Sequence, residues 1–493
     1  MQHLLTQLQR HAVYHPERLA LISGDTQINY RELARRVKTL KHALSDTGGR
    51  SFAFQLDNGP DWIVNDLAAA ASGFNVIPIP GFFSDRQRDH VLSDAMVDIY
   101  AASDDLPLGP DWQASIDSNE NTRAIFRRTV ATEIESLDTK ITYTSGSTGN
   151  PKGVVLASNT IDQVAQSIVT AMSSLAIDKH LCLLPMATLL ENIAGVYAPI
   201  MRGITIDCPS LADVGLSGAN LDIEKFCKTL NASKPDSIIL VPQLLTALVT
   251  LAEFGMLDTS SLKMIAVGGG RISQHLLARA EQLNLPVFQG YGLSECCSVL
   301  TLNTPEANRV GSVGKPLPHA KLRISSEGEI EAQGSVMRGY LGAQRVEHAW
   351  YATGDLGYID DDGYVFITGR RKNLFITSFG RNVNPEWVEA ALTQQPAIAQ
   401  ALIFGEAQAH NLALLWLRYE QTDEALSQII AQTNAELPDY AQVHEYIVLA
   451  APIDAQLTTA NGRLKREQVV ARYQNEINAH YRRVSEGNDY GIL

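Results

Sequence analysis

The sequence predicts an α/β protein in which a large domain of layered sheets and helices is followed by a smaller α+β domain. Apolar runs typical of buried strands alternate with helical patterns, such as residues 237–242 before 243–254 and residues 264–267 before 273–283. Such alternation is typical of parallel sheets covered by helices. The chain has 493 residues, which is too long for one ordinary hydrophobic core, so we expect more than one folding unit.

After about residue 317 the sequence changes to short strand-like segments separated by glycine turns. Asp362-Gly363 lies between two such segments and is a strong hairpin signal. Beyond residue 372 the chain continues as a smaller α+β region, and the linker before it is short and charged. These features predict domains at residues 1–370 and 371–493, with the second domain able to pivot on the linker.

Composition and charge narrow the class of function. The chain has 40 Lys and Arg residues against 54 Asp and Glu residues, for a formal net charge of −14, which disfavours binding to nucleic acid or to an anionic membrane. No segment approaches the roughly 18 to 20 uninterrupted apolar residues of a spanning helix, and the N-terminus lacks an apolar signal region. The five cysteines show no metal-ligand spacing. We expect a cytoplasmic enzyme acting on a small molecule, with no membrane span.

The most informative segment is residues 141–157, where a strand-like run enters a loop rich in glycines and hydroxyls. Glycines let backbone N–H groups converge on an anion, hydroxyls add donors, and Lys152 supplies positive charge. The pattern is not a Walker A loop, because Lys152 lies between Pro151 and Gly153. A flexible Ser/Gly linker is disfavoured by the apolar runs on either side. The predicted phosphate loop consists of Thr144, Ser145, Gly146, Ser147, Thr148 and Gly149.

This segment closely resembles the phosphate-loop signature of the adenylate-forming superfamily, which includes acyl-CoA synthetases, adenylation domains of peptide synthetases and firefly-type luciferases. Further matching motifs follow in the family's order, at residues 267–273, 290–295, 350–359 and 367–389. The resemblance covers essentially the whole chain. It implies a large N-terminal domain of layered α/β sheets with a β-barrel-like part, and a small mobile C-terminal domain that swings about a hinge at Lys372.

The resemblance also implies an ATP site. In it, the 267–273 turn lines the adenine pocket, Tyr291 stacks on adenine, and Glu295 holds Mg²⁺, which requires oxygen ligands. Asp355 grips both ribose hydroxyls, for which an acceptor-only carboxylate is suited, and Arg370 contacts ribose or phosphate. Taken alone, the glycine turn could equally be a tight strand-to-helix connection. Beyond the phosphate loop, the implied nucleotide-binding residues are Gly268, Gly269, Gly270, Gly290, Tyr291, Gly292, Ser294, Asp355 and Arg370.

The C-terminal region carries the features expected of the thiol-transfer step. The loop at residues 378–382 resembles the one that lines the family's thiol tunnel, where Gly380 leaves room for a phosphopantetheine arm. The Asn-Pro-Glu segment at residues 384–386 has a purely structural explanation as a helix start with proline in its first turn.

The resemblance is incomplete near the C-terminus. Family members carry a lysine that contacts the acid and the α-phosphate, whereas residues 457–467 place Arg463 in that position and Lys465 two residues later. An arginine can neutralise the same anions, although its planar fork does not copy an ammonium. In an extended segment residues two apart face the same side, so Lys465 is the alternative. We favour Arg463, and loss of adenylation activity is the third interpretation.

The acid pocket is expected in residues 183–197, which resemble the acid-pocket helix of long-chain acyl-CoA synthetases. Thr188 replaces the family's histidine, and Ala187, Leu189 and Ile193 leave the wall apolar. No aspartate stands where amino-acid-activating domains hold an α-ammonium. This favours a fatty or otherwise apolar acid and a place in fatty acid metabolism, with chain length and aromaticity open. A plain core helix is the alternative interpretation.

Together these features predict an AMP-forming ligase that uses ATP and Mg²⁺ to convert a carboxylic acid to an acyl-adenylate, releasing pyrophosphate. The acyl group then passes to a thiol, with CoA the expected co-substrate. The expected catalytic residues are Lys152, Glu295 and Arg463 or Lys465. One alternative is a stand-alone enzyme that loads the phosphopantetheine of an acyl carrier protein. A non-catalytic nucleotide-binding protein is a distant third.

Overall fold

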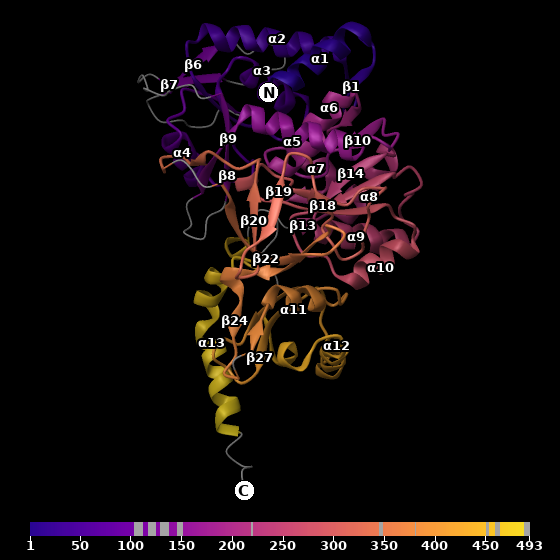
Figure 1. Ribbon diagram of the computed structural model, residues 1–493, viewed down its shortest axis with the longest axis vertical. Helices are drawn as coiled ribbons and strands as arrows, with labels where there is room; N and C mark the ends of the chain where they lie inside the picture. The colour runs from indigo at the N-terminus through magenta and orange to yellow at the C-terminus, as the bar shows by residue number, and fades with distance from the viewer. Residues whose placement is uncertain are drawn as a thin grey trace. The chain divides into compact units, whose positions relative to one another are not determined.

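The computed structural model describes residues 1–102, 112–116, 125–128, 138–144, 151–217, 220–344, 349–379, 381–449, 453–458 and 464–487. The described residues form two compact units, which divide between Leu374 and Phe375 (Figure 1). The expected boundary after residue 370 lies four residues before this division. In the described part of the chain, no helix is both long enough and apolar enough to cross a membrane.

The first unit contains two large mixed sheets. Each is parallel at its centre and has antiparallel strands toward its edges, so the expected layered α/β architecture is confirmed. The first sheet runs in the order β21 (Gly339–Tyr340), β9 (Lys152–Ala157), β8 (Thr139–Thr144), β4 (Asn75–Pro78), β3 (Ser51–Gln55), β5 (Ile99–Ala102), β7 (Ile125–Arg128) and β6 (Trp112–Ile116). The second runs in the order β18 (Lys315–Pro316), β17 (Thr301–Leu302), β16 (Val287–Tyr291), β15 (Met264–Val267), β14 (Ser237–Leu240), β10 (Lys179–Leu181), β11 (Thr205–Asp207), β1 (Leu19–Ser23) and β2 (Thr26–Asn29).

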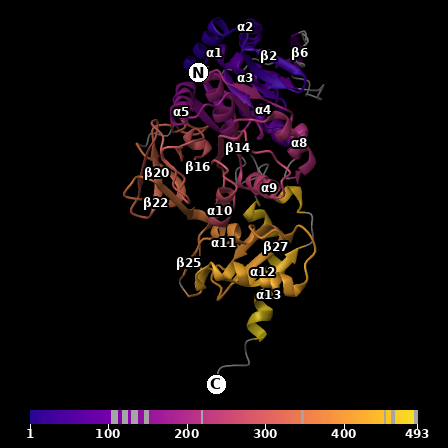
Figure 2. The same ribbon diagram turned by 90° about the vertical axis from the view of Figure 1, so that its right-hand side faces the viewer.

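A third, antiparallel sheet forms the last part of this unit, where a barrel-like part is expected. It runs β19 (Lys321–Ile324), β20 (Glu329–Gln333), β22 (Tyr351–Ile359) and β23 (Val365–Arg370). Gly363 has φ of +85° in the turn between β22 and β23, so the predicted Asp-Gly hairpin is confirmed. Figure 2 shows β20 and β22, in orange, on the side of the unit opposite α8 and α9. The first unit also contains, among the described residues, a separate two-stranded ribbon of β12 (Leu216–Ser217) and β13 (Asn220–Leu221).

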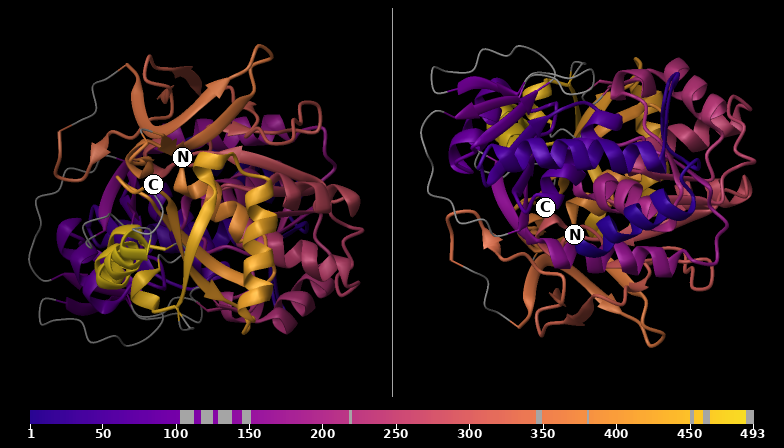
Figure 3. Two further views of the ribbon diagram at one scale, coloured as in Figure 1. Left: turned by 90° about the horizontal axis from the view of Figure 1, so that it is seen from below. Right: turned by 90° about the horizontal axis from the view of Figure 1, so that it is seen from above.

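Helices pack on these sheets, and their ends follow from local sequence. The Asn29 side chain accepts a hydrogen bond from the backbone N–H of Glu32 at 2.9 Å and caps α2, and Ser84 with Gln87 forms a capping box at α4. The right-hand view of Figure 3 shows α1 and α2, in indigo, side by side. The helices are α1 (Gln2–Tyr14), α2 (Tyr30–Asp46), α3 (Pro60–Ala71), α4 (Asp85–Asp94), α5 (Ser158–Ala171), the π-helix η1 (Glu191–Tyr197), α6 (Ala198–Arg202), α7 (Leu211–Val214), α8 (Ile223–Ser233), α9 (Pro242–Glu253), α10 (Gln274–Gln282) and the single 3₁₀ turns η2 (Ser294–Cys296) and η3 (Arg371–Asn373).

The second unit is a small α+β fold. Its sheet has the order β26 (Ile398–Phe404), β27 (Asn411–Leu417) and β28 (Val443–Leu449). The predicted helix start at Asn384 is confirmed, since its side chain accepts from the N–H of Glu386 at 3.1 Å and Pro385 occupies the first turn. The other elements are β24 (Phe375–Ile376), β25 (Asn382–Val383), α11 (Pro385–Leu392), α12 (Asp423–Ala435), η4 (Asp439–Ala441), η5 (Ala455–Leu457) and α13 (Arg466–Gly487). The left-hand view of Figure 3 looks along α13.

Candidate active site

The two strands that flank the predicted phosphate loop form an antiparallel pair. Thr144 at the end of β8 lies opposite Lys152 at the start of β9, so the chain leaves and re-enters the sheet at one place. Ser145, Gly146, Ser147, Thr148 and Gly149 lie outside the described residues. The sheet therefore delivers the Thr144 hydroxyl and the exposed Lys152 ammonium to the two ends of the predicted loop.

Lys152 and Glu295 meet around a residue that no motif indicated. Tyr340 lies on β21, which pairs with β9, and the Lys152 Nζ lies 5.6 Å from the centre of its ring. The Tyr340 hydroxyl donates a hydrogen bond to Glu295 Oε1 at 2.9 Å. Burial, together with the Glu295 carboxylate, raises the pKa of Tyr340 to about 12, so the phenol stays protonated and remains a donor. The structure thus brings a carboxylate, a phenol and an ammonium together.

The surroundings of Glu295 fit a magnesium ligand. The residue lies in η2 directly after β16, and the backbone N–H of Met337 donates to its carbonyl at 2.7 Å. Its carboxylate is half-buried and oriented by Tyr340. Mg²⁺ prefers oxygen ligands and is usually held by one or two carboxylates together with phosphate oxygens. Glu295 could therefore hold the ion, which would supply neutralising charge to the phosphates.

The structure brings together three of the predicted nucleotide-binding residues: Tyr291, Asp355 and Arg370. Asp355 and Arg370 are direct partners in the β22–β23 pairing, and Arg370 Nε donates to Asp355 Oδ1 at 2.9 Å. The Tyr291 hydroxyl donates to Asp355 Oδ2 at 2.7 Å, and burial followed by the nearby carboxylate raises the pKa of Tyr291. Asp355 is only 4% exposed. Both oxygens that a ribose diol would use already accept hydrogen bonds from the protein.

We expect Tyr291→Phe to lower the midpoint of urea unfolding, because the buried Asp355 carboxylate loses a donor. A hydrogen bond to a charged group contributes about 1.5–3 kcal/mol. The aromatic ring remains, so AMP affinity measured by calorimetry should change little, whereas Asp355→Ala should weaken it strongly. Tyr358→Phe is the matched control, since Tyr358 is 49% exposed and stacks on Phe366. An equal loss of AMP affinity in Tyr291→Phe and Asp355→Ala would contradict this division of roles.

The triple-glycine turn lies at the end of a parallel strand. Gly268, Gly269 and Gly270 follow β15, and α10 begins soon after with Ser273 as its capping residue. A Cβ placed on Gly268 would lie 3.6 Å from Leu190 Cδ2 and 3.7 Å from the carbonyl of Gly290. The turn is therefore next to β16 and to the predicted acid segment. Leu190 is a candidate wall residue that the sequence motifs did not indicate.

The residues of the 290–295 motif have distinct structural positions. Gly290 and Tyr291 end β16, and Ser294 begins η2. A Cβ on Gly292 would lie 1.5 Å from the carbonyl oxygen of Ser298, so close backbone approach alone requires glycine there. Its presence needs no contact with a nucleotide, and that part of its role stays a prediction.

The predicted acid segment is a turn followed by the π-helix η1. The Thr188 hydroxyl donates to the carbonyl of Pro185 at 2.7 Å, so it closes the turn that leads into the helix. Ala187 and Leu189 are buried, and Ile193 is fully buried within the apolar core. A fully buried Ile193 fits the plain-core interpretation at that position. The acid-contacting role of Ala187, Thr188 and Leu189 stays a prediction.

One buried group among the described residues has the ligand types of a metal site. His180, Cys182 and Glu191 place their ligand atoms within 4.8 Å of one another. His180 Nε2 and Glu191 Oε1 lie 3.1 Å apart, His180 Nδ1 and Ser237 Oγ lie 2.9 Å apart, and burial raises the pKa of the Cys182 thiol. These contacts satisfy the polar atoms without an ion. We interpret the group as an anchor for the start of η1.

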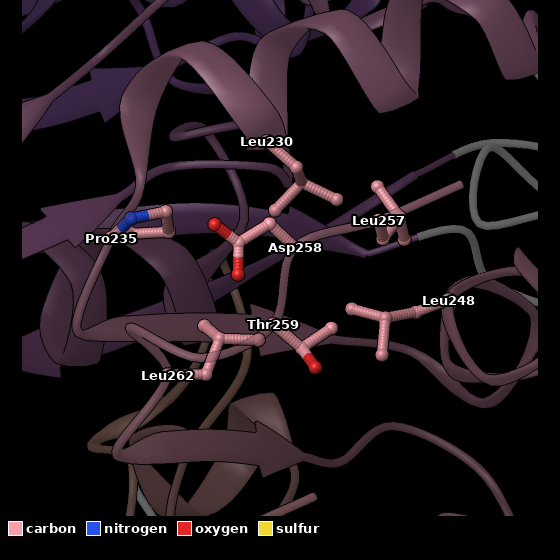
Figure 4. Close-up of a pocket in the computed structure, with 7 residues that line it drawn as sticks. All are labelled: Leu230, Pro235, Leu248, Leu257, Asp258, Thr259 and Leu262. Carbon is pink, nitrogen blue, oxygen red and sulfur yellow. The ribbon is translucent and has the colours of Figure 1, made fainter. Parts of the chain in front are cut away.

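Two cavities in the first unit are too small to hold a substrate. One, lined by residues that include Met172, Ala194 and Met264, has a volume of about 40 Å³, little more than one water molecule occupies in the liquid. The other, shown in Figure 4, has about 10 Å³, and none of the predicted site residues lines it. Its lining consists of Leu230, Pro235, Leu248, Leu257, Asp258, Thr259 and Leu262.

The predicted residues of the C-terminal region fall in several places. Lys372 lies exposed in η3, just before the division between the units. Gly380 and Arg463 lie outside the described residues. Lys465 directly precedes α13, and its ammonium donates to the carbonyl of Gln456 at 2.9 Å. The Lys465 side chain is therefore already engaged within the second unit.

Comparison with known proteins gives two family matches. The AMP-binding enzyme family matches residues 8–341, and the AMP-binding enzyme C-terminal domain matches residues 372–485. A 2-succinylbenzoate–CoA ligase from Bacillus velezensis is 30% identical over 421 residues, which covers 79% of this chain and 82% of that protein.

Two solved structures of CoA ligases have the same fold over most of their length. O-succinylbenzoate coenzyme A synthetase from Bacillus subtilis, in complex with ATP and magnesium ion, matches with a TM-score of 0.74 at 24% identity, covering 94% of this chain and 98% of that chain. The anthranilate CoA ligase AuaEII, in complex with anthranoyl-AMP, matches with a TM-score of 0.79 at 18% identity, covering 95% and 96%.

Proposed function

The chain belongs to the AMP-binding enzyme family of adenylate-forming ligases, and on this premise we propose that it joins an aromatic carboxylic acid to CoA through an acyl-adenylate. Family membership together with its CoA ligase relatives supports an AMP-forming acid–CoA ligase. The acid and the roles of individual residues are the proposed part. The observation that carries the proposal is the convergence of Lys152 and Glu295 on Tyr340, at the end of the strands that flank the predicted phosphate loop.

The sequence suggested a fatty or otherwise apolar acid and left aromaticity open, and we propose an aromatic acid. The expectation of fatty acid metabolism is not supported by the relatives, which are named for 2-succinylbenzoate and anthranilate, both benzene rings that bear a carboxylate. The apolar side chains of Leu189 and Leu190 suit the face of a flat ring. These observations favour a compact acid.

Binding of ATP sets up the first step. Lys152 and Thr144 hold the β- and γ-phosphates, and Glu295 would hold a magnesium ion, which would supply neutralising positive charge. Asp355 accepts from the ribose hydroxyls once Tyr291 or Arg370 gives way. The acid lies against residues 187–190, next to the glycine turn at Gly268. The protein's contribution is to bring two anions together and to stabilise charge as it moves.

Adenylation is a displacement at phosphorus. A carboxylate oxygen attacks the α-phosphorus, a new P–O bond forms, and the bond to pyrophosphate breaks. Arg463 stabilises the crowded anions in this step. We favour it over Lys465, whose ammonium donates to Gln456 within its own unit.

Thioester formation completes the reaction. The sulfur of CoA attacks the acyl carbon, a C–S bond forms, the bond to AMP breaks, and the thiol proton passes to solvent. The second unit pivots at Lys372 between the two steps, and Gly380 leaves room for the phosphopantetheine arm. A carrier protein as acceptor has no support from the relatives, which are named as CoA ligases.

Acid-dependent ATP–pyrophosphate exchange tests the proposal. We expect exchange with 2-succinylbenzoate, anthranilate or a related aromatic acid, followed by AMP release when CoA is added. Dodecanoate and phenylalanine serve as the fatty and amino acid comparisons, and a holo-acyl carrier protein as the alternative acceptor.

Each part of the proposal has its own contrary result. Preferred exchange with dodecanoate would restore the fatty acid interpretation, and exchange with phenylalanine alone would exclude an apolar pocket. AMP release with the carrier protein but not with CoA would identify the carrier protein as the acceptor. Absence of exchange with every acid would favour a non-catalytic nucleotide-binding protein.

A further inference from the structure

A closed network of buried polar side chains lies inside the first unit. Lys140 Nζ donates to Asp66 Oδ1 at 2.6 Å, to Asn192 Oδ1 at 2.5 Å and to the Tyr197 hydroxyl at 2.5 Å. The Tyr197 hydroxyl donates to Asp66 Oδ2, and the Asn192 amide donates to the same oxygen at 3.2 Å. Every proton of the ammonium and both oxygens of the carboxylate are used.

Burying this network costs free energy. The side chains of Lys140 and Asp66 are 2% and 0% exposed, and burial lowers the pKa of Lys140 against the opposing effect of Asp66. Removing two charges from water costs free energy that their mutual attraction only partly offsets, so well-packed apolar side chains would often serve stability as well or better. The network therefore calls for an explanation other than stability alone.

The network joins three elements that meet the predicted site. Lys140 is on β8, which runs directly to Thr144 at the start of the phosphate loop. Asp66 is on α3, and Asn192 and Tyr197 are on η1, which forms the second half of the predicted acid segment. In a π-helix the hydrogen bonds join residues five apart, and here residues 192 and 197 both face Lys140.

The start of η1 is held separately. Glu191, its first residue, lies 3.1 Å from the ring of His180 and accepts from the N–H of Leu184 at 3.2 Å. A Cβ on Gly195 would lie 2.2 Å from the Glu191 carboxylate, so glycine makes room for this contact. The helix is therefore fixed both at its first residue and along the side that faces β8.

We propose that Lys140 and Asp66 are positioning residues for adenylation, holding the strand that leads to the phosphate loop and the π-helix of the acid segment in one register. The proposal rests on the proposed function, in which ATP and the acid lie at the ends of these elements. With the network in place, the α-phosphate and the carboxylate meet in a reactive geometry. A displacement of about 1 Å can reduce a reaction rate roughly 100-fold.

The test uses the full chain with both charges replaced by apolar groups. Single variants Lys140→Met and Asp66→Leu leave one charge buried and should unfold at much lower urea concentration. The double variant Lys140→Met/Asp66→Leu should recover most of that loss. Its maximal rate of acid-dependent pyrophosphate exchange should nevertheless fall about 10- to 100-fold and its KM for the acid should rise, while CoA-dependent breakdown of supplied acyl-adenylate changes less than about twofold.

Two further variants separate positioning from stability. Ile161→Ala removes fully buried apolar contacts from α5 and should destabilise the fold with no change in the acid KM. Tyr197→Phe removes one hydroxyl and keeps the ring, so it should fold and give an intermediate KM. A wild-type acid KM in both the double variant and Tyr197→Phe would overturn the proposal.

Amide hydrogen exchange provides a readout that does not depend on the acid. The amides of η1 and β8 should exchange faster in the double variant than in the wild-type protein, while those of α5 keep their protection. Unchanged exchange in η1 would overturn the positioning role even if no substrate were known. Faster exchange in η1 combined with no pyrophosphate exchange in the wild-type protein would instead overturn the proposed function.

Discussion

Glu295→Gln should lower the rate of acid-dependent pyrophosphate exchange by about 10²- to 10³-fold and raise the Mg²⁺ concentration needed for half-maximal rate. The amide keeps the size of the side chain and its contact with Tyr340, but removes the charge that a hard dication requires. The measurement is the exchange rate across a magnesium titration at saturating ATP and acid.

Glu281→Gln is the matched control for this variant. Glu281 is an exposed residue of α10, so its loss should leave both the rate and the magnesium dependence unchanged. AMP affinity in the absence of magnesium should be similar in Glu295→Gln and the wild-type protein. A slow variant with an unchanged magnesium dependence would assign Glu295 a role other than metal binding.

Arg463→Ala should reduce adenylation by about 100-fold and leave thioester formation from supplied acyl-adenylate nearly unchanged. The cation is needed when the acid meets the α-phosphate, and the second step starts after that bond exists. Lys465→Ala should have a much smaller effect, because the Lys465 ammonium donates to Gln456. Single-turnover measurement of each half-reaction separates the two steps.

Arg463→Lys tests whether a lysine, the residue type that the family carries at this position, can replace Arg463. We expect it to retain most of the adenylation rate. Arg472→Ala, at an exposed position on α13, is the control for a general loss of positive charge from the second unit. A severe loss in Lys465→Ala with a mild one in Arg463→Ala would reverse the assignment.

Features that are local in sequence were predictable. Alternating apolar runs predicted the parallel sheets, the Asp362-Gly363 hairpin and the helix start at Asn384 are in place, and the resemblance to adenylate-forming enzymes is confirmed. Each depends on a few adjacent residues whose backbone preferences or spacing act over short range. The resemblance named Tyr291, Asp355 and Arg370 as nucleotide-binding residues, but their mutual hydrogen bonds were seen only in the structure.

Contacts between distant segments were not predictable. Tyr340 lies 45 residues from Glu295 and reaches it because β21, only two residues long, pairs with β9. Lys140 and Asp66 are separated by 74 residues, and nothing in the sequence of either element marks the two as partners. A periodicity of 3.6 residues cannot reveal that η1 is a π-helix. Register, strand order and burial of such residues depend on the whole fold.

The facing positions of Thr144 and Lys152 limit how the loop between them can evolve. Because β8 and β9 are hydrogen-bonded up to these two residues, the intervening segment spans a fixed gap. A one-residue slip of the pairing would turn every side chain of β9, Lys152 included, to the opposite face of the sheet. Homologous genes should therefore keep the length of this segment, a constraint that adds to the one that phosphate binding places on its residue types.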